Sequence, residues 1–292
     1  MKSLPLSLAA VWLLLCAPFL PGQTPNPPPD AKPLRAFHIG NSLTFGVVSD
    51  PNHRAFMSGH GVDYKAGYHV LWGQSLATIW DKADAPSATV QQYGNFKNAL
   101  EKSDWDVLTL QAWGSQFEGE KGDAAMARKY IELATARNPA IQIYIYETWP
   151  FKDKEGKLDF AAKWKREFPK PGNWDSVWNS TYCKKLVAKL NGDLPDLKKP
   201  VKLIPAGTVL AAIDQQIREG KLTGIQKTEQ LYKDDIHLTP LGNYIVRCTF
   251  YAVLRNESPQ GRPGNELFKD VSPENGKLIQ DTVWRVVSAK QD

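Results

Sequence analysis

The sequence predicts an α/β protein built as a three-layer α/β/α sandwich around a central, mostly parallel sheet. Short runs of apolar, β-branched or aromatic residues alternate along the chain with longer stretches of helical spacing, which is the pattern of βαβ units. The 292 residues show no internal repeat and no sign of a second domain. Strands of such a sheet are covered by helices on both faces and therefore consist of continuous apolar runs.

The expected strands and helices follow from these two patterns. The strands, in chain order, are Leu34–Ile39, Trp105–Leu110, Ile141–Tyr146 and Val201–Ile204. The helices are Ser75–Lys82, Val90–Lys102, Ala124–Arg137, Ser176–Leu190, Thr208–Arg218, Leu241–Arg255 and Glu274–Ser288. An insertion at about residues 151–176 interrupts the alternation with charged and aromatic residues, among them Trp164 and Trp174; with the nearby Trp178 it is a candidate lid or substrate wall.

The N-terminal segment has the layout of a secretory signal peptide. Residues 1–23 place one basic residue, Lys2, before an apolar run from Leu4 to Leu20. A membrane anchor is the alternative, but prolines interrupt the run and no basic cluster follows it. Residues 24–33 form a proline-rich linker. We therefore expect one folded domain over 34–292, secreted or periplasmic, with no membrane span after cleavage.

Composition excludes several classes of protein. Hydrophobic residues make up 42% of the chain and charged residues 23%, which excludes a largely disordered protein and a polytopic membrane protein. The net charge of +5 is spread along the chain without a run of like charges, so no nucleic-acid partner is expected. After export, Cys183 and Cys248 could pair in an oxidising compartment or stay as two buried thiols, and the sequence leaves both open.

Two polar blocks carry the chemistry. Gly40-Asn41-Ser42 follows the first expected strand, and the carboxyl ends of parallel strands are where active sites of such sheets lie. A serine needs an adjacent base to act as a nucleophile, usually an imidazole oriented by a carboxylate. Near the end of the chain, Asp234 precedes His237 by three residues, close enough for its carboxylate to reach the histidine ring. Asp235 is the less well spaced competitor for this role.

The two blocks resemble those of the GDSL, or SGNH, family of serine hydrolases. That family places its nucleophile in a Gly-Asp-Ser block after the first strand and its acid and base in an Asp-x-x-His block near the end. The resemblance extends from about Leu34 to Arg255. It implies an SGNH-hydrolase fold of flavodoxin-like type, a triad of Ser42, His237 and Asp234, and no cofactor and no metal.

The resemblance also implies an oxyanion hole, in which this sequence departs from the family pattern. The Ser42 N–H and the Gly73 N–H fit as backbone donors, Gly73 lying between a strand-like segment and an expected helix. The family asparagine is absent after the buried strand that ends at Leu110. Gln111 carries the same amide one methylene further out and is the expected substitute, with Gln116 less favoured.

Tryptophans lie next to the expected catalytic blocks. Trp72, Trp113 and Trp149 each follow an expected strand or strand-like segment, so we expect them at the rim of the site, together with Asn41, as substrate-binding residues. Aromatic faces at a cleft rim suit the apolar faces of sugar rings. The alternative, a place in the core, is accepted for Trp80, Trp105 and Trp284.

The remaining histidines have other interpretations. His38 lies within the first expected strand and is expected to be a packed or hydrogen-bonded core residue. His53, His60 and His69 could form a metal site, but their spacing is not that of common metal motifs. We favour His53 and His69, with Arg54, as pocket-lining or surface groups.

The sequence therefore predicts an exported serine esterase that acts on an acylated carbohydrate, with O-acetyl groups on a polysaccharide as the favoured substrate, or on another small ester. One alternative is a catalytically disabled carbohydrate-binding protein on the same fold. Others are a lipase or lysophospholipase and a glycan-cleaving enzyme. The sequence leaves the oligomeric state open.

Overall fold

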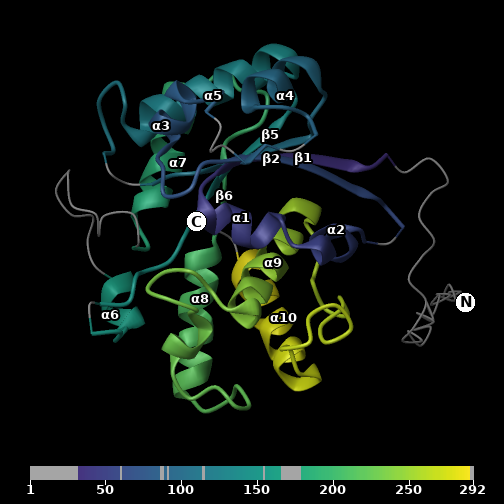
Figure 1. Cartoon of the computed structure of the whole chain (residues 1–292), viewed down its shortest axis with the longest axis vertical. Helices are drawn as coiled ribbons and strands as arrows, with labels where there is room; N and C mark the ends of the chain where they lie inside the picture. Colours follow the sequence, from purple (N-terminus) through teal and green to yellow (C-terminus); the bar gives the residue numbers. More distant parts are fainter. Residues whose placement is uncertain are drawn as a thin grey trace, which may run out of the picture.

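The computed structural model describes residues 32–59, 61–85, 89–90, 92–113, 116–153, 155–165 and 179–289. It has three layers, with a twisted sheet between two layers of helices (Figure 1). The six strands run in the order β3-β2-β1-β4-β5-β6. All pair in parallel except β3, which is antiparallel to β2 at one edge. The predicted fold class is therefore confirmed; the expected signal peptide and residues 24–31 of the linker lie outside the described residues.

The bounds of the elements are as follows. The strands are β1 (Leu34–Gly40), β2 (Tyr64–Val70), β3 (Thr89–Val90), β4 (Val107–Gln111), β5 (Gln142–Tyr146) and β6 (Lys202–Ile204). The helices are α1 (Ser42–Val48), α2 (Pro51–Met57), α3 (Leu76–Asp81), α4 (Phe96–Lys102), α5 (Asp123–Arg137), α6 (Phe160–Trp164), α7 (Tyr182–Asp193), α8 (Ala206–Arg218), α9 (Pro240–Arg255) and α10 (Pro273–Ser288), with a 3₁₀ helix at Thr228–Leu231.

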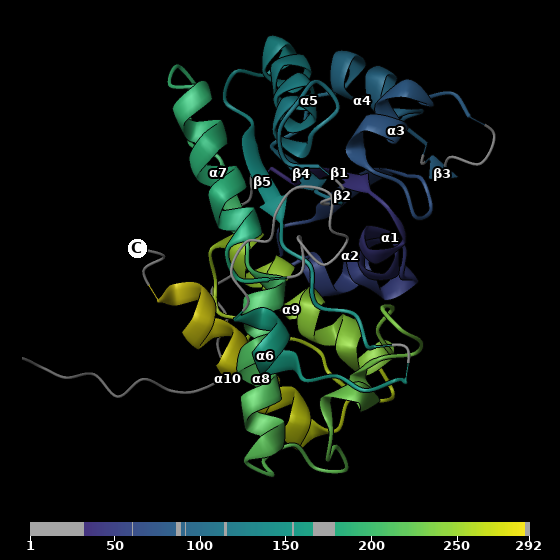
Figure 2. The ribbon, with the colours of Figure 1, turned by 90° about the vertical axis from the view of Figure 1, so that its left-hand side faces the viewer.

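Each face of the sheet has its own core. Helices α3, α4, α5 and α7 cover one face, and α1, α2, α8, α9 and α10 cover the other (Figures 1 and 2). Successive side chains of a strand point to opposite faces, so Ala36 of β1 joins the core under α9 whereas Phe37 and Ile39 join the core under α4 and α5. Both cores are made of almost fully buried apolar side chains.

The register of the sheet brings the ends of three strands together. In the pairing of β1 with β2, Gly40 is opposite Val70, and in the pairing with β4, Ile39 is opposite Leu110. After β1 the chain continues to β2 on one side of β1 and later crosses to β4 on the other side of β1. The strand order therefore reverses between β1 and β4. Ligands of open α/β sheets bind in the crevice at this point.

The four predicted strands are present, whereas the helices α1, α2 and α6 and the strands β2 and β3 were not predicted. Strand β2 contains Lys65, Gly67 and His69, which break the continuous apolar run expected of a buried strand. The predicted helix at Val90–Lys102 begins only at Phe96, because Asn95 caps it and Val90 pairs with β2. Helices α1 and α2 are seven residues each, too short for a periodic pattern to reveal.

The two cysteines belong to different cores. Cys183 lies in the core under α7 and Cys248 in the core on the opposite face, and both are buried free thiols. The sheet separates them, so the pairing left open above does not occur. Among the helices of the described ranges, none combines the length and the apolar character needed to cross a membrane.

The part of the insertion that contains α6 packs against the rest of the domain. Trp164, at the end of α6, is 6% exposed and packs against Gly207, where a Cβ would overlap the indole ring. Trp164 is therefore a core residue of the layer that contains α8, and the expectation that it forms part of a lid is wrong. Trp174 and Trp178 lie outside the described residues.

His38 is the core histidine that its strand position predicted. It is fully buried; its Nδ1 lies 2.8 Å from Thr109 Oγ1 and its Nε2 lies 2.8 Å from Tyr64 Oη. Burial lowers the pKa of His38 to about 3. The ring is therefore neutral in the folded protein throughout the physiological range.

This burial predicts a specific contribution to acid denaturation. In the unfolded chain His38 binds a proton near pH 6.5, but in the folded protein only near pH 3. Between these values the unfolded state holds one more proton, so the free energy of unfolding falls as the pH is lowered, by about 1.4 kcal/mol per pH unit. His38→Gln should reduce the slope between pH 6 and 4 by about this amount in urea unfolding measured at a series of pH values. Parallel curves for the two proteins would contradict the assignment.

Candidate active site

Ser42 is held by a tight connection between β1 and α1. Asn41 is the N-cap of α1, and its Oδ1 accepts a hydrogen bond from the Leu43 N–H at 3.1 Å. A Cβ at Gly40 would overlap Thr44 Oγ1, so the close approach of the helix to the strand end requires glycine. The Gly40-Asn41-Ser42 block is therefore a capped helix start with Ser42 as the first residue of the helix. An amide can cap a helix as well as a carboxylate can, which explains why asparagine fits where the family has aspartate.

Ser42, His237 and Asp234 form a connected triad in the structure. His237 Nε2 lies 2.8 Å from Ser42 Oγ. On the other side of the ring, Nδ1 lies 2.8 Å from Asp234 Oδ2 and 3.0 Å from Oδ1. The side chains of His237 and Asp234 are 40% and 50% exposed, so the triad opens to solvent. The carboxylate that contacts the ring is that of Asp234 and not that of Asp235.

Asp234 is held as an anion by its own loop. Although partial desolvation acts to raise it, the pKa of Asp234 lies below its ordinary value, because the backbone N–H groups of Ile236 and His237 and the His237 ring hydrogen-bond to the carboxylate. An ionised carboxylate beside Nδ1 fixes the imidazole with its Nε2 toward the serine and stabilises the imidazolium form.

The loop that carries His237 is attached to the segment after β5. Trp149 is 1% exposed, and its Nε1–H donates to the carbonyl of Ile236 at 2.7 Å. Two further bonds join the same segments: the Lys152 N–H donates to Asp235 O at 2.8 Å, and the Tyr232 hydroxyl donates to Pro150 O at 2.9 Å. The expectation that Trp149 lies at the rim and binds substrate is therefore wrong. Its indole is buried because it supports the backbone next to His237.

Two backbone donors remain available at the strand ends. Gly73 has a φ of 63°, a conformation that favours glycine, and lies in the exposed loop after β2. This loop touches the nucleophile block, since Asn41 Nδ2 donates to Gln74 O at 3.3 Å. Within the described residues, neither the Ser42 N–H nor the Gly73 N–H donates to a protein acceptor. Both can therefore serve an incoming ligand.

Gln111 does not have the geometry expected of an oxyanion donor. It is 2% exposed, and its Oε1 accepts from the Asn41 N–H at 3.1 Å, the Thr44 N–H at 3.2 Å and the Thr44 hydroxyl at 2.6 Å. Its Nε2 donates to Asn41 Oδ1 at 2.8 Å. The amide thus lies behind Ser42 and binds both sides of the block, because the backbone groups there would otherwise be buried without partners. Thr44 was not predicted as part of the site, although its spacing of one helical turn from Asn41 could have indicated it.

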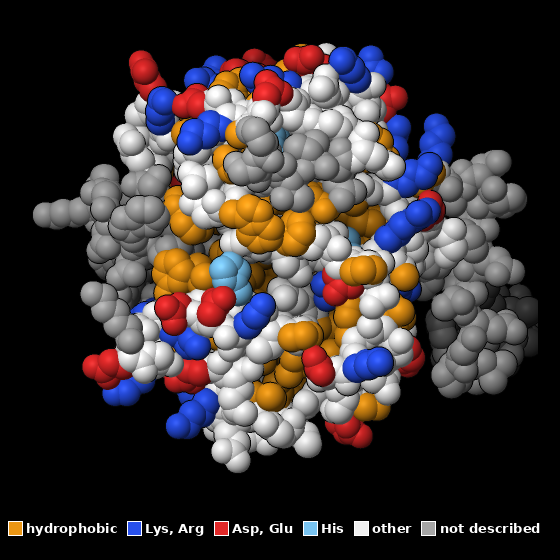
Figure 3. Space-filling model, in the orientation of Figure 1, with side chains coloured by type: hydrophobic (Ala, Val, Ile, Leu, Met, Phe, Trp, Pro, Cys, Tyr) orange, Lys and Arg blue, Asp and Glu red, His pale blue; other side chains and the backbone are white. Residues whose placement is uncertain are grey.

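The other expected substrate-binding residues divide in the same way. Asn41 is fully buried and its side chain is used in capping and in the contacts to Gln74 and Gln111, so the structure corrects its assignment as a substrate contact. Trp72 is 48% exposed and packs edge-on against Phe45, with ring centroids 4.7 Å apart. Trp113 is half-buried, two residues beyond the end of β4. Figure 3 shows hydrophobic side chains gathered over α1, next to a surface histidine and acidic side chains.

The histidines considered for a metal site do not come together. His53 belongs to α2, and its ring packs edge-on against Tyr64 on the face of the sheet that α1 and α2 cover. His69 stacks on Phe96 in the opposite core, and its Nδ1 accepts from the Phe96 N–H at 3.2 Å. His60 lies outside the described residues. Among the residues that are described, no group of three histidine, cysteine, aspartate or glutamate side chains is arranged to hold a metal ion.

Comparisons with known proteins bear on the fold. No family model matches the sequence, and no curated protein does. A crystal structure of a DUF4886 family protein from Bacteroides uniformis is similar with a TM-score of 0.61 and 16% identity, over 89% of this chain and 96% of that chain. A member of the lipolytic protein G-D-S-L family from Veillonella parvula aligns at a TM-score of 0.45 and 14% identity, over 77% of this chain and 100% of that one. A carbohydrate esterase family 3 structure from Talaromyces cellulolyticus aligns at 0.43 and 12%, over 82% and 100%.

The sheet order, the serine after β1 and the Asp-x-x-His block before α9 agree with the resemblance seen in the sequence. The chain has a three-layer α/β/α fold similar to that of the DUF4886 family protein from Bacteroides uniformis.

Proposed function

We propose that this protein is a serine esterase in which Ser42, His237 and Asp234 form the catalytic triad. The observation that carries the proposal is the unbroken contact from Ser42 Oγ through the imidazole to the Asp234 carboxylate, with 2.8 Å at each end. Nucleophile, base and orienting acid are thus within hydrogen-bond distance before any substrate binds.

The reaction follows from this geometry. Ser42 Oγ attacks the ester carbonyl carbon while His237 Nε2 takes the hydroxyl proton. The N–H groups of Ser42 and Gly73 stabilise the negative charge on the carbonyl oxygen. The tetrahedral intermediate collapses, His237 returns the proton to the leaving alcohol, and the acyl group remains on Ser42. Water, deprotonated by His237, then attacks the acyl-enzyme and releases the acid, which restores the serine.

The favoured substrate is an O-acetylated polysaccharide. Trp72 supports this choice because its exposed indole stands beside Gly73, where it can pack against a sugar ring whose acyl group reaches Ser42. The open triad also suits a polymer better than a buried tunnel would, since a chain can lie across it. Export through the signal peptide at residues 1–23 is part of the same proposal.

The proposal is tested by product analysis on an acetylated polysaccharide. Release of acetate with the glycan chain length unchanged is the expected result. Shorter oligosaccharides without acetate would indicate a glycan-cleaving enzyme and not an esterase. The absence of both products would favour the disabled carbohydrate-binding protein. Hydrolysis confined to long-chain fatty esters would favour the lipase.

The role of Trp72 predicts a change in KM. Trp72→Ala should raise KM for the acetylated polysaccharide about tenfold, because an aromatic–sugar contact of about 1.4 kcal/mol is lost. Trp72→Phe retains an aromatic face and should restore most of the affinity. The measurement is the initial rate of acetate release over a range of polysaccharide concentrations. Equal KM values for the alanine and phenylalanine variants would show that the indole does not contact the glycan.

A further inference from the structure

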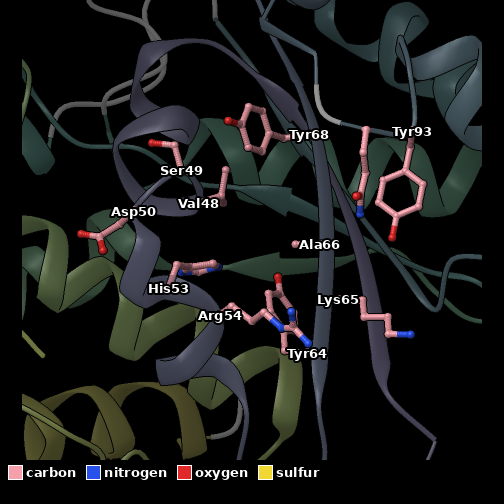
Figure 4. Close-up of a pocket in the computed structure, with 11 residues that line it drawn as sticks. Val48, Ser49, Asp50, His53, Arg54, Tyr64, Lys65, Ala66, Tyr68 and Tyr93 are labelled. Atoms are coloured by element: carbon pink, nitrogen blue, oxygen red, sulfur yellow. The ribbon is translucent and has the colours of Figure 1, made fainter.

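A cavity lies beside the outer edge of β2, away from the triad. It has a volume of about 410 Å³ and is formed by the end of α1, by α2, by β2 and by the segment after β3 (Figure 4). Pockets for small molecules start at about 300 Å³. The side chains that line it include Ser49, His53, Tyr64, Ala66, Tyr68 and Tyr93. The cavity is therefore large enough for a small ligand and is rich in aromatic and hydroxyl groups.

His53 is the unusual residue of this cavity. It is 2% exposed, yet neither of its ring nitrogens has a hydrogen-bond partner among the described residues. His38, the neighbouring core histidine, has both nitrogens bonded. A buried polar group without a partner costs about 1–3 kcal/mol. The two free nitrogens therefore point to a ligand that supplies the missing hydrogen bonds.

The chemistry of that ligand follows from the state of the ring. Burial, followed by the nearby positive charge of Arg247, holds the pKa of His53 well below its ordinary value. A neutral imidazole presents one donor and one acceptor. Hydroxyl groups satisfy both, because each can donate and accept, whereas a carboxylate or phosphate oxygen only accepts.

The charges around the cavity do not select an ion. Asp50 is paired with Arg247 at 2.9 Å, and Arg54 is paired with Asp63 at 2.8 Å. Lys65 carries no ion pair within the described residues, but it is exposed and extends from the other face of β2 (Figure 4). The tyrosine rings, in contrast, offer flat apolar surfaces of the kind that pack on sugar rings.

A row of aromatic side chains lies between the cavity and the triad. Tyr68, in the cavity wall, packs edge-on against Phe45 at 5.7 Å, and Phe45 packs against Trp72 at 4.7 Å. Helix α1 joins the two sites, since Ser42 begins it and Ser49 follows it. Seven residues of helix rise about 10 Å. An extended oligosaccharide can therefore reach from Ser42 to the cavity.

We propose that this cavity binds an unmodified neutral sugar residue of the glycan whose acylated residue lies at Ser42. The identity of the ligand rests on the proposed function. The cavity and the ring nitrogens of His53 without hydrogen-bond partners among the described residues are observations that do not depend on the catalysis. In this arrangement His53 hydrogen-bonds to sugar hydroxyls, Tyr68, on the face of β2 that His53 approaches, packs beside the ring, and Trp72 supports the segment between the two sites.

The test is a binding experiment on the full chain with Ser42→Ala, which removes turnover. Protein labelled with ¹⁵N in its histidine rings is titrated with neutral hexasaccharides of xylose, glucose, mannose or N-acetylglucosamine. The expected result is a saturable shift of the His53 ring signals, identified by their loss in His53→Phe, with at least one of these sugars. Shifts at His237 alone, or no shift with any sugar, would overturn the proposal.

A second variant keeps the test independent of His53. Ala66→Trp fills the cavity from β2 without removing a polar group, and we expect it to lower the affinity for the binding hexasaccharide at least about tenfold. Lys202→Trp places the same side chain on β6, the strand at the opposite edge of the sheet, and should bind as the parent does. Equal affinities for the two variants, with equal thermal unfolding, would overturn the assignment. Because the titration needs no hydrolysis, failure of the esterase proposal and failure of this one give different results.

Discussion

Ser42→Ala is expected to lower kcat for 4-nitrophenyl acetate by on the order of 10⁴-fold or more. The variant removes the atom placed to form the acyl-enzyme, Oγ at 2.8 Å from His237 Nε2. It leaves the cap of α1 intact, since the capping contact comes from Asn41. The measurement is the steady-state rate of nitrophenolate release, with circular dichroism to show that the fold is unchanged.

A matched control separates the nucleophile from serines in general. Ser103 is the C-cap of α4 and precedes β4, so it lies toward the amino end of that strand and away from the triad, and Ser103→Ala should retain full activity. A fluorophosphonate probe should label the parent and the Ser103 variant but not the Ser42 variant, because only an activated serine reacts. Full activity in Ser42→Ala would exclude the triad, and an unlabelled parent would favour the disabled carbohydrate-binding protein.

The partner of Ser42 makes the same result sharper. His237→Ala should lose as much activity as Ser42→Ala, and the double variant should lose no more than either single one. Residues that act as one unit show this non-additivity, since removal of one member makes the others ineffective. Additive losses would mean that the 2.8 Å contact between the two side chains does not reflect a shared catalytic step.

The sequence indicated the three residues that the structure brings together, Ser42, His237 and Asp234, because their signals are local. Ser42 directly follows a strand, and Asp234 and His237 are three residues apart, so the sheet topology needed only to bring two short blocks together. The strands of the sheet were equally predictable where both of their faces are apolar, as in β4 and β5. Strand β2 was not predicted because it contains polar residues whose hydrogen-bond partners lie elsewhere in the chain. The Phe96 N–H, for example, donates to His69.

Whether each tryptophan is exposed or buried could not be predicted from its position along the chain. Trp72 and Trp149 each follow a strand or strand-like segment, yet one is 48% exposed and the other is 1% exposed. The difference lies in what packs over each strand end. The loop around Ile236 returns from 87 residues further along the chain and covers Trp149, whereas within the described residues Trp72 is left open. Such long-range contacts have no signature in a local pattern.

Gln111 shows the same limit at the site itself. The sequence placed an amide at the end of β4 and suggested a role toward the substrate, whereas the structure turns the amide toward the nucleophile block. Because its oxygen accepts three hydrogen bonds, Gln111 fixes the position of Ser42 from behind. The two roles differ in what the loss of the amide does to stability.

Gln111→Leu is expected to lower the free energy of unfolding by about 3 kcal/mol, because the N–H groups of Asn41 and Thr44 become buried without partners. It should also lower kcat about 100-fold, since a displacement of about 1 Å at a nucleophile has an effect of this size. Urea unfolding and 4-nitrophenyl acetate kinetics measure the two. Gln142→Leu is the matched control: Gln142 begins the neighbouring strand β5 at its opposite end, and its Nε2 donates to Pro200 O at 2.8 Å.

The control should lose about 1–2 kcal/mol of stability while keeping kcat. Thr44→Val removes only the 2.6 Å hydroxyl contact to Gln111 and leaves any oxyanion donor in place. Positioning from behind therefore predicts that Thr44→Val lowers kcat in the same direction as Gln111→Leu, and that the double variant shows a coupling energy of about 1 kcal/mol in unfolding. The opposite result would be a Gln111→Leu protein with parental stability and low kcat together with a fully active Thr44→Val protein. That result would mean that the Gln111 amide acts as an oxyanion donor.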